Sequence, residues 1–321
     1  MIKIAAIFNL FTFNSFFGTG FIFCFFSYLG LWRIFLVFHN AYPSIGKQFT
    51  YMLYIPSVVF WSSGILKDGF CMGCLGLIIY NVEKLKLNDK KILIRILIIV
   101  ISFNLIWLIK SYIVLCLIIP LLLWKYSFIF IKLKEKISVK KLWFINLIVV
   151  LFIFRFANLK QRIQSISLEE LYTLVIKTRA GFMNSSDTDS STFSLGEFSA
   201  TLGGFITQIP KAVNAVLFRP YIWETKKIFS LIAATESLLF LVCTILVIKK
   251  VGIKSSVKSF ISNPDIIFCF LFTFLFSAAL GFSVSNFGAL VRFKIQFMPF
   301  FVVGLLLIYH KKSKRDEIPL I

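Results

Sequence analysis

Ionisable side chains at the ends of apolar runs are the residues of this chain best placed to do chemistry, because a charge beside hydrocarbon is costly. The first such segment is Pro56–Asp68, in which Pro56 and Gly64 weaken a helix. Lys67 and Asp68 then end the apolar run. One interpretation is a broken helix that presents an ammonium and a carboxylate at the mouth of a cavity. The other is a tight turn between two spans, which the same residues favour.

Two further segments place cations on short connections between apolar runs. Lys110 separates two such runs, with Tyr112 beside it. Its ammonium either extends toward the lipid headgroups or attracts a phosphate as a point charge. Arg292 and Lys294 precede the last apolar run. These two cations either anchor the chain at the interface or bind an anionic lipid headgroup.

The segment Leu217–Glu224 has the richest chemistry. Its Arg219 carries a guanidinium fork that matches a phosphate or a carboxylate. Tyr221 and Trp223 suit either a belt at headgroup level or a platform on which a sugar ring stacks. Glu224 is either a general base or a carboxylate near a helix start, where the helix dipole favours negative charge.

The elements that must position these residues are membrane-spanning helices. Of the 321 residues 59% are hydrophobic and 40 are Phe, and the mean hydropathy is +0.89, which a soluble domain cannot bury. We predict an all-α fold, a polytopic transmembrane helix bundle of about nine spans with one long extracytoplasmic segment. The predicted spans are Phe16–Phe38, Thr50–Leu66, Gly69–Val82, Ile92–Ile109, Tyr112–Ile131, Leu142–Phe156, Ile228–Ile248, Ile266–Phe287 and Ile295–Tyr309.

The basic residues predict the orientation of these spans. The net charge of +21 comes from clusters between apolar runs, not from the patch or stripe of a nucleic-acid-binding domain, so no nucleic-acid partner is expected. The clusters at 84–95, 132–141, 249–258 and 311–315 are separated by even numbers of crossings, so all can lie on one side. The positive-inside rule makes that side cytoplasmic. The composition is typical of a low-GC bacterium, and we predict a bacterial cytoplasmic (inner) membrane protein with its C-terminus in the cytoplasm.

The chain then divides into three parts. Residues 1–156 form an N-terminal transmembrane bundle. Residues 157–227 form the extracytoplasmic and interfacial segment, with a helix around Leu168–Ile176 and an apolar stretch, Phe198–Phe218, that lies along the interface. Residues 228–321 form the C-terminal transmembrane helices and a basic cytoplasmic tail. All four ionisable segments map to the external face in this arrangement.

No metal site and no cofactor are predicted. Cys71 and Cys74 have the CxxC spacing of a metal site, but no second pair and no nearby His completes it. His39 and His310 lie at cytoplasmic ends of spans, which argues against histidine-based acid–base chemistry.

Four motifs resemble those of a group of uncharacterised bacterial polytopic membrane proteins that is similar to GT-C-type glycosyltransferases and polysaccharide-assembly proteins. These motifs are Pro56–Asp68, Ile109–Tyr112, Leu217–Glu224 and Val291–Lys294. The resemblance implies transfer of a sugar from a polyprenyl-phosphate donor at the external face, with an acidic residue of the first external loop as base. This chain departs from that pattern, because no Asp or Glu precedes Asp68.

We therefore predict a membrane protein of cell-envelope polysaccharide or glycolipid biosynthesis, with membrane lipids and a lipid-linked sugar as its partners. The predicted catalytic carboxylates are Asp68 and Glu224. The predicted residues for binding substrate and lipid phosphate are Lys67, Lys110, Tyr112, Arg219, Trp223, Arg292 and Lys294.

Two alternatives stay open at this point. One is a transporter or flippase for a lipid-linked glycan, which needs costly residues at mid-membrane. Glu236 and, less deeply, Arg155 are the candidates for that role, and Glu236 is expected to pair with a Lys or Arg or to be protonated. The other alternative is a non-catalytic membrane subunit.

Overall fold

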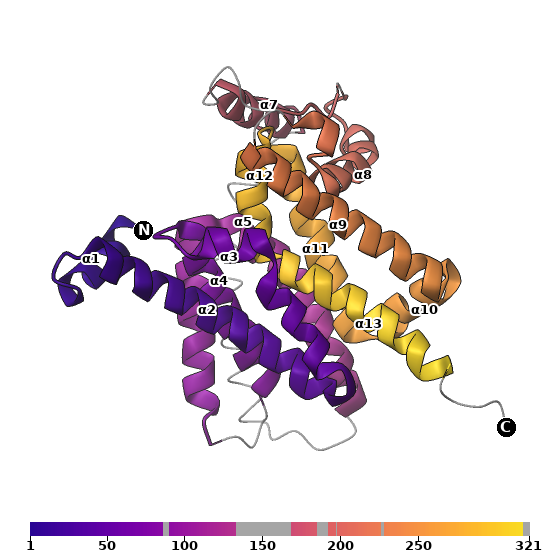
Figure 1. Cartoon of the computed structure of the whole chain (residues 1–321), viewed down its shortest axis with the longest axis horizontal. Coiled ribbons are helices and arrows are strands. Elements are labelled where there is room, and N and C mark those ends of the chain that lie inside the picture. Colours follow the sequence, from indigo (N-terminus) through magenta and orange to yellow (C-terminus); the bar gives the residue numbers. More distant parts are fainter. Residues whose placement is uncertain (86–89, 133–167, 185–191, 197, 226–227, 317–321) are drawn as a thin grey trace.

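A computed structural model of the chain describes residues 1–85, 90–132, 168–184, 192–196, 198–225 and 228–316. Within these ranges the fold is helical, and the sole β-pairing there is an isolated bridge between Thr192 and Asn286. The elements, shown in Figure 1, are α1 (Ile2–Phe11), α2 (Phe16–Ala41), η1 (Pro43–Tyr54), α3 (Pro56–Ser62), α4 (Lys67–Lys84), α5 (Ile92–Lys132), α7 (Leu168–Asn184), α8 (Leu202–Phe218), η2 (Ile222–Glu224), α9 (Ile228–Val251), α10 (Ile253–Ser262), α11 (Pro264–Ser283), α12 (Phe287–Phe293), η3 (Lys294–Gln296) and α13 (Met298–Asp316).

Among the described residues, four helices are long and apolar enough to cross a membrane, namely α2, α5, α9 and α11. Two bent pairs raise this number to six if each is one span: α3 with α4, bent by 108°, and α12–η3 with α13, bent by 62°. The helical, membrane-spanning class is as predicted, and the described residues account for four to six of the nine predicted spans. The stretch Thr50–Leu66 is divided between η1 and the seven-residue α3, and each is too short to cross a bilayer alone. The predicted span Leu142–Phe156 lies outside the described residues.

Helix breaks fall where the sequence places polar or conformationally special residues. Pro56 occupies the first turn of α3, where its missing N–H costs nothing. Lys110 has an extended backbone, with φ −149° and ψ 79°, so α5 consists of two helical segments that meet there. The Asn286 side chain caps α12 by accepting hydrogen bonds from the amides of Gly288 and Ala289. Of these three breaks, the one in α5 brings an ionisable side chain, Lys110, to a helix end.

Helices α2 and α4 approach each other closely through glycines. A Cβ atom added at Gly76 would lie 1.9 Å from the carbonyl oxygen of Gly30, and one added at Gly30 would lie 2.5 Å from the Cα of Gly73. Small residues permit such backbone contact between membrane helices. Elsewhere the core is aromatic, as where Phe272 packs edge-on against Phe300 with their ring centroids 5.3 Å apart.

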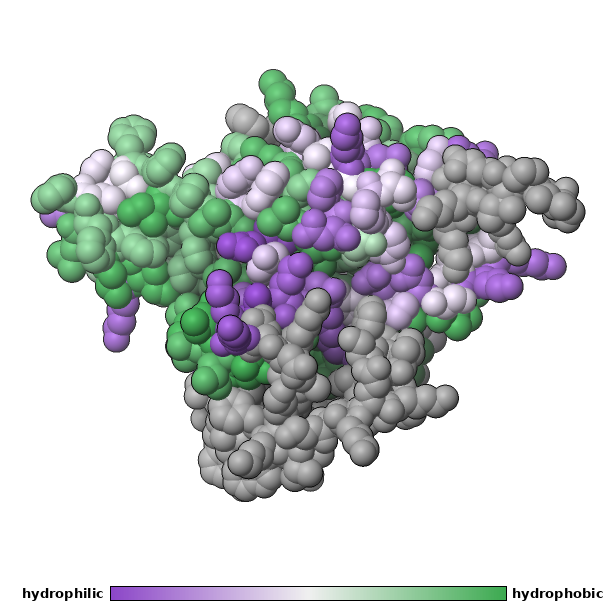
Figure 2. Space-filling model, turned by 90° about the horizontal axis from the view of Figure 1, so that it is seen from below, coloured by the Kyte–Doolittle hydropathy of each residue, from purple (hydrophilic) through white to green (hydrophobic). Residues whose placement is uncertain are grey.

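Helix α11 lies at the centre and packs against α5, α8 and α13. Helices α7 and α8 lie together at the top of Figure 1, above α11 and beside α12. The predicted helix around Leu168–Ile176 is present as the longer α7, and most of the predicted interfacial stretch forms α8. Figure 2 views the molecule from the opposite end, where hydrophilic side chains gather across the middle of the face, flanked by hydrophobic ones.

Candidate functional site

Asp68 is the centre of a buried ionic cluster. It lies in the first turn of α4 and is fully buried. Its carboxylate accepts hydrogen bonds from the Lys110 ammonium at the break in α5, from Nε of Arg292 in α12 at 2.7 Å, and from Nε2 of Gln296 in η3 at 3.1 Å. Three segments far apart in the sequence therefore meet at one carboxylate, and we call these four residues the Asp68 cluster.

Aromatic rings surround the cations of the Asp68 cluster. The Lys110 ammonium lies 4.0 Å from the ring centroid of Phe293 and 5.7 Å from that of Tyr112, distances at which the ring quadrupole attracts a cation. The Arg292 side chain keeps 31% of its surface exposed, whereas Asp68 keeps none. Arg292 is therefore the part of this cluster that a ligand can reach.

A second buried cluster lies between α3, α9 and η3. Glu236 accepts hydrogen bonds from the amide and the hydroxyl of Ser57, both at 2.7 Å, and lies 3.8 Å from the Lys294 ammonium. The Ser57 amide belongs to the first turn of α3, where helical amides have no helical partner. The expectation that Glu236 pairs with a Lys or Arg is confirmed. Lys294 in turn donates to the Ser237 hydroxyl at 3.2 Å.

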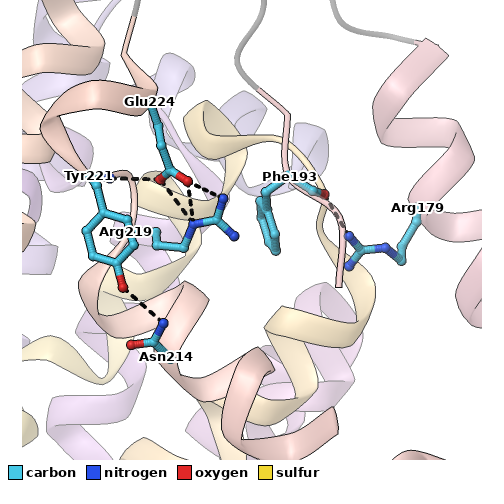
Figure 3. Close-up of polar contacts among 6 residues, drawn as sticks. All are labelled: Arg179, Phe193, Asn214, Arg219, Tyr221 and Glu224. Carbon is cyan, nitrogen blue, oxygen red and sulfur yellow. Dashed lines mark hydrogen bonds and ion pairs between the residues drawn. The ribbon is translucent and has the colours of Figure 1, made fainter. Parts of the chain in front are cut away.

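Arg219 and Glu224 form a third cluster in the turn between α8 and α9, drawn in Figure 3. Nε of Arg219 donates to both carboxylate oxygens of Glu224 at 3.0 Å, and Nη2 donates to one of them. The amide of Tyr221 donates to the same carboxylate at 2.9 Å. The guanidinium also lies 5.2 Å from the ring centroids of Phe193 and of Phe287. This arrangement fixes the plane of the Arg219 fork.

The pKa of Glu224 lies below the ordinary glutamate value. Partial burial alone would raise the pKa, but the hydrogen bonds from Arg219 and from the Tyr221 amide, together with the charge of Arg219, outweigh that effect. A group whose pKa is lowered by folding stabilises the fold fully above its unfolded pKa, about 4.3 for glutamate. That stabilisation is lost as the pH falls through the lowered folded value.

We therefore expect the melting temperatures of the wild type and Glu224→Gln to differ by a constant amount from neutral pH down to about pH 5. Below about pH 4 the difference should shrink, because Glu224 then takes up a proton and loses its charge in the wild type. Melting in detergent across this pH series measures it. A difference that already vanishes near pH 6 would contradict the lowered pKa of Glu224.

The three clusters are connected. The Ser237 hydroxyl, which accepts from Lys294, donates to the backbone carbonyl of Arg219 at 3.2 Å. Lys294 and Arg292 are two residues apart on α12–η3, so one short segment reaches both buried clusters. A path of polar contacts therefore runs from Glu224 through Ser237 to the buried Lys294–Glu236 pair.

The structure brings most of the predicted site residues together and leaves two of them at the surface. Lys67 is exposed at the start of α4, and it makes no ion pair among the described residues. Trp223 is 79% exposed and stacks on the Tyr221 ring, with a centroid distance of 4.8 Å. Both side chains are free to meet a ligand from outside.

Sequence reasoning missed several residues that complete these clusters. Gln296 follows Arg292 by four positions, the spacing of helical neighbours, and this spacing could have revealed it. Ser57 directly follows a proline at a helix start, which is a further usable signal. Nothing in the sequence marks Arg179 of α7, whose guanidinium donates to the carbonyls of Gly281 at 2.8 Å and Phe193 at 2.9 Å.

No family model, curated protein or solved structure matches this chain. The charges of the three clusters are therefore the main guide to chemistry. In their ordinary charge states the Arg219–Glu224 and Lys294–Glu236 pairs are each neutral. Among the described residues, the Asp68 cluster has two cations for one carboxylate and so keeps one positive charge. A partly exposed guanidinium with an excess positive charge beside it is suited to an anionic ligand.

Proposed function

We propose that this chain is an integral membrane protein of bacterial cell-envelope polysaccharide or glycolipid biosynthesis. It binds a polyprenyl-phosphate-linked sugar at the extracytoplasmic face and transfers that sugar in the manner of a GT-C-like glycosyltransferase. The observation that carries the proposal is the uncompensated positive charge of the Asp68 cluster, held in an apolar helical domain. Such a charge is costly in a membrane and is retained where an anionic substrate neutralises it.

Two guanidinium groups are suited to hold the lipid phosphate. Arg292 has a third of its surface free, and Asp68 fixes its orientation through Nε. Lys110 adds positive charge behind the same carboxylate. Because a guanidinium binds two phosphate oxygens at once, Arg292 orients the phosphate as well as attracting it. Arg219 is the second guanidinium, and it binds the phosphate when its ion pair with Glu224 breaks.

The orientation proposed for the chain has the N-terminus outside and the C-terminus inside. The three ionic clusters then face the outer leaflet. The hydrophilic face in Figure 2 lies at the opposite end of the molecule from α7. Its polar character is what a cytoplasmic face requires under the positive-inside rule.

Glu224 is the better placed of the two candidate bases. Hydrogen-bond donors occupy the carboxylate oxygens of both residues, but Asp68 is fully buried, whereas the Glu224 side chain keeps 19% of its surface exposed. When a phosphate draws Arg219 away, the Glu224 carboxylate is released and its pKa rises toward the ordinary value. It then takes the proton of an acceptor hydroxyl. The acceptor oxygen bonds to the anomeric carbon of the donor sugar, the bond from that carbon to the phosphate oxygen breaks, and polyprenyl phosphate leaves.

We expect Arg292→Ala to weaken binding of a labelled polyprenyl-phosphate-sugar to the purified protein in nanodiscs by at least about tenfold, the effect of losing one charge-assisted contact. The variant should fold, because Asp68 keeps Lys110 as a partner. Lys254→Ala, an exposed change in α10 on the proposed cytoplasmic side, is the matched control and should bind as the wild type does. Unchanged binding in both Arg292→Ala and Arg219→Ala would overturn the proposal.

The principal alternative is a flippase for a lipid-linked glycan. The buried Lys294–Glu236 pair favours it, because a charge pair between α9 and η3 is the kind of group that a transport path uses. Proteoliposomes that contain the protein and a fluorescent lipid-linked sugar separate the two functions. Movement of the label between leaflets without transfer to an acceptor indicates the flippase, and transfer without movement indicates the transferase.

A further inference from the structure

A small pocket opens beside Arg219, between α8 and the turn that precedes α9. Its volume is about 280 Å³, and its walls include Lys211, Asn214, Tyr221 and Trp223. That volume lies just below the range of small-molecule sites, roughly 300–1,000 Å³. The pocket therefore suits a ligand about the size of a single sugar ring. Four of its residues, Asn214, Arg219, Tyr221 and Glu224, are drawn in Figure 3.

One wall of the pocket is an aromatic platform. The rings of Tyr221 and Trp223 stack with an angle of 20° between their planes. The stacking leaves most of the indole surface open to solvent, since Trp223 is 79% exposed. Asn214 holds the platform in place, because its Nδ2 donates to the Tyr221 hydroxyl at 3.1 Å. An open aromatic face of this kind packs against the apolar C–H face of a sugar ring.

Other residues that line the pocket offer hydrogen-bonding groups that are not used up among the described residues. The Asn214 amide retains its oxygen and a second N–H, which accept from and donate to hydroxyls. Ser194 also lines the pocket; its hydroxyl accepts a hydrogen bond from the Gly196 amide at 3.0 Å and keeps its O–H to donate. Arg219 engages Glu224 through Nε and Nη2, and its Nη1 makes no hydrogen bond to the described residues.

The charge of the pocket is positive. Lys211 is exposed and makes no ion pair among the described residues. Arg219 adds a second cation, and among the described residues Glu224 is the one carboxylate that lines the pocket. The sum is one positive charge, so a neutral sugar leaves an ammonium without a partner, whereas an anionic substituent on the sugar neutralises it.

We propose that this pocket binds an acidic sugar unit of the acceptor glycan, with the ring on Tyr221–Trp223 and its anionic group at Lys211 and Arg219. The inference rests on the proposed function and names the chemical class of its acceptor. The anionic group is either a carboxylate or a phosphate, because both offer oxygens to the same two cations.

Intrinsic fluorescence of the nanodisc-embedded protein tests this inference. The probes are an oligogalacturonate, a sugar-phosphate oligomer, and a neutral oligogalactose of the same length. We expect at least one of the acidic probes to change the emission, and the neutral probe to bind at least about tenfold more weakly, the effect of one charge-assisted contact. Comparing the oligogalacturonate with the sugar-phosphate oligomer shows whether the anionic group is a carboxylate or a phosphate. Trp223→Phe should abolish the signal, because the reporting indole is then absent.

Two variants report on the contacts themselves by titration with labelled oligosaccharide. Lys211→Gln should lower acidic binding to the level of the neutral probe without affecting folding, because its side chain is exposed. Trp223→Ala should weaken every probe, because the stacking platform is lost. Equal binding of acidic and neutral probes, or acidic binding that neither variant alters, would overturn the inference.

A membrane anchor is the competing use of the same aromatic pair. If Trp223 is such an anchor, brominated lipids in the nanodisc quench its fluorescence strongly, and added oligosaccharide leaves that quenching unchanged. This outcome also overturns the inference.

The oligosaccharide result is independent of the test of lipid-phosphate binding. If Arg292→Ala weakens binding of the lipid-linked sugar while this pocket binds no oligosaccharide, only the acceptor site is wrong. If the pocket binds acidic oligosaccharide and Arg292→Ala has no effect, the transferase proposal fails and a glycan-binding site remains.

Discussion

Gly76→Ala is expected to destabilise the protein by at least about 3 kcal/mol, at the upper end of the cost of overpacking. The added Cβ would lie 1.9 Å from the carbonyl oxygen of Gly30 and 2.4 Å from its Cα. Both obstacles are backbone atoms, so no side chain can rotate aside. Helices α2 and α4 must separate to relieve the contact, and that separation opens the packing around them.

Thermal unfolding in detergent measures this effect. After heating, size-exclusion chromatography gives the fraction of protein that still elutes as a monodisperse peak. Gly181→Ala is the matched control, because Gly181 is also a helical glycine and nothing lies within 4 Å of its added Cβ. That change should leave the stability unchanged or raise it by about 0.5–1 kcal/mol, since alanine is the better helix former. If both variants melt like the wild type, the close approach of α2 and α4 is incorrect.

Asp68→Asn is expected to cost about 3–5 kcal/mol of stability, the usual effect of removing one partner from a buried ion pair. Asparagine keeps the size of the side chain but leaves the Lys110 ammonium and the Arg292 guanidinium without a counter-charge. The Lys110 side chain is nearly buried, with 9% of its surface exposed, so water cannot replace the lost partner. We expect a large fall in melting temperature and in the yield of folded protein.

Two comparisons separate this effect from a general loss of polar contact. Glu83→Gln breaks the Lys125–Glu83 pair, whose side chains keep 25% and 31% of their surface exposed, and should cost no more than about 1 kcal/mol. The double variant Asp68→Asn with Lys110→Met should be more stable than Asp68→Asn alone, because one orphaned charge is removed with its partner. A double variant as unstable as the single one would show that charge is not the cause.

The sequence predicts the single long apolar helices well and the broken ones poorly. Phe16–Phe38 corresponds to α2 within a few residues. The backbone of an uninterrupted apolar run in a membrane must satisfy its own hydrogen bonds, and a helix does so. The break at Lys110 is also visible as one cation between two such runs. A break within Pro56–Asp68 is one of the two interpretations that the sequence allows, but apolarity alone does not show that the chain turns by 108° between α3 and α4.

The ionic contacts between residues close in the sequence are also easier to predict than those between residues far apart. The Arg219–Glu224 pair lies within one short turn, so sequence spacing is enough to suggest it. The kind of partner that Glu236 needs follows from the cost of burying a carboxylate, but its identity depends on how η3 folds back against α9. Asp68 appears in the sequence as the end of an apolar run, and only the tertiary packing of α4, α5 and α12 makes it a buried centre.

The ion pairs of α4 with α5 have a consequence for chain length. Asp68 and Glu83 are fifteen positions apart on α4, and their partners Lys110 and Lys125 are fifteen positions apart on α5. At 1.5 Å per residue each interval is about 22 Å, so these two stretches run in the same direction and match at both ends. One residue inserted or deleted between the paired positions rotates one partner by about 100° and moves it by about 1.5 Å, so only one of the two pairs can then close. Over this stretch the number of residues matters more to the helix register than the identity of most side chains.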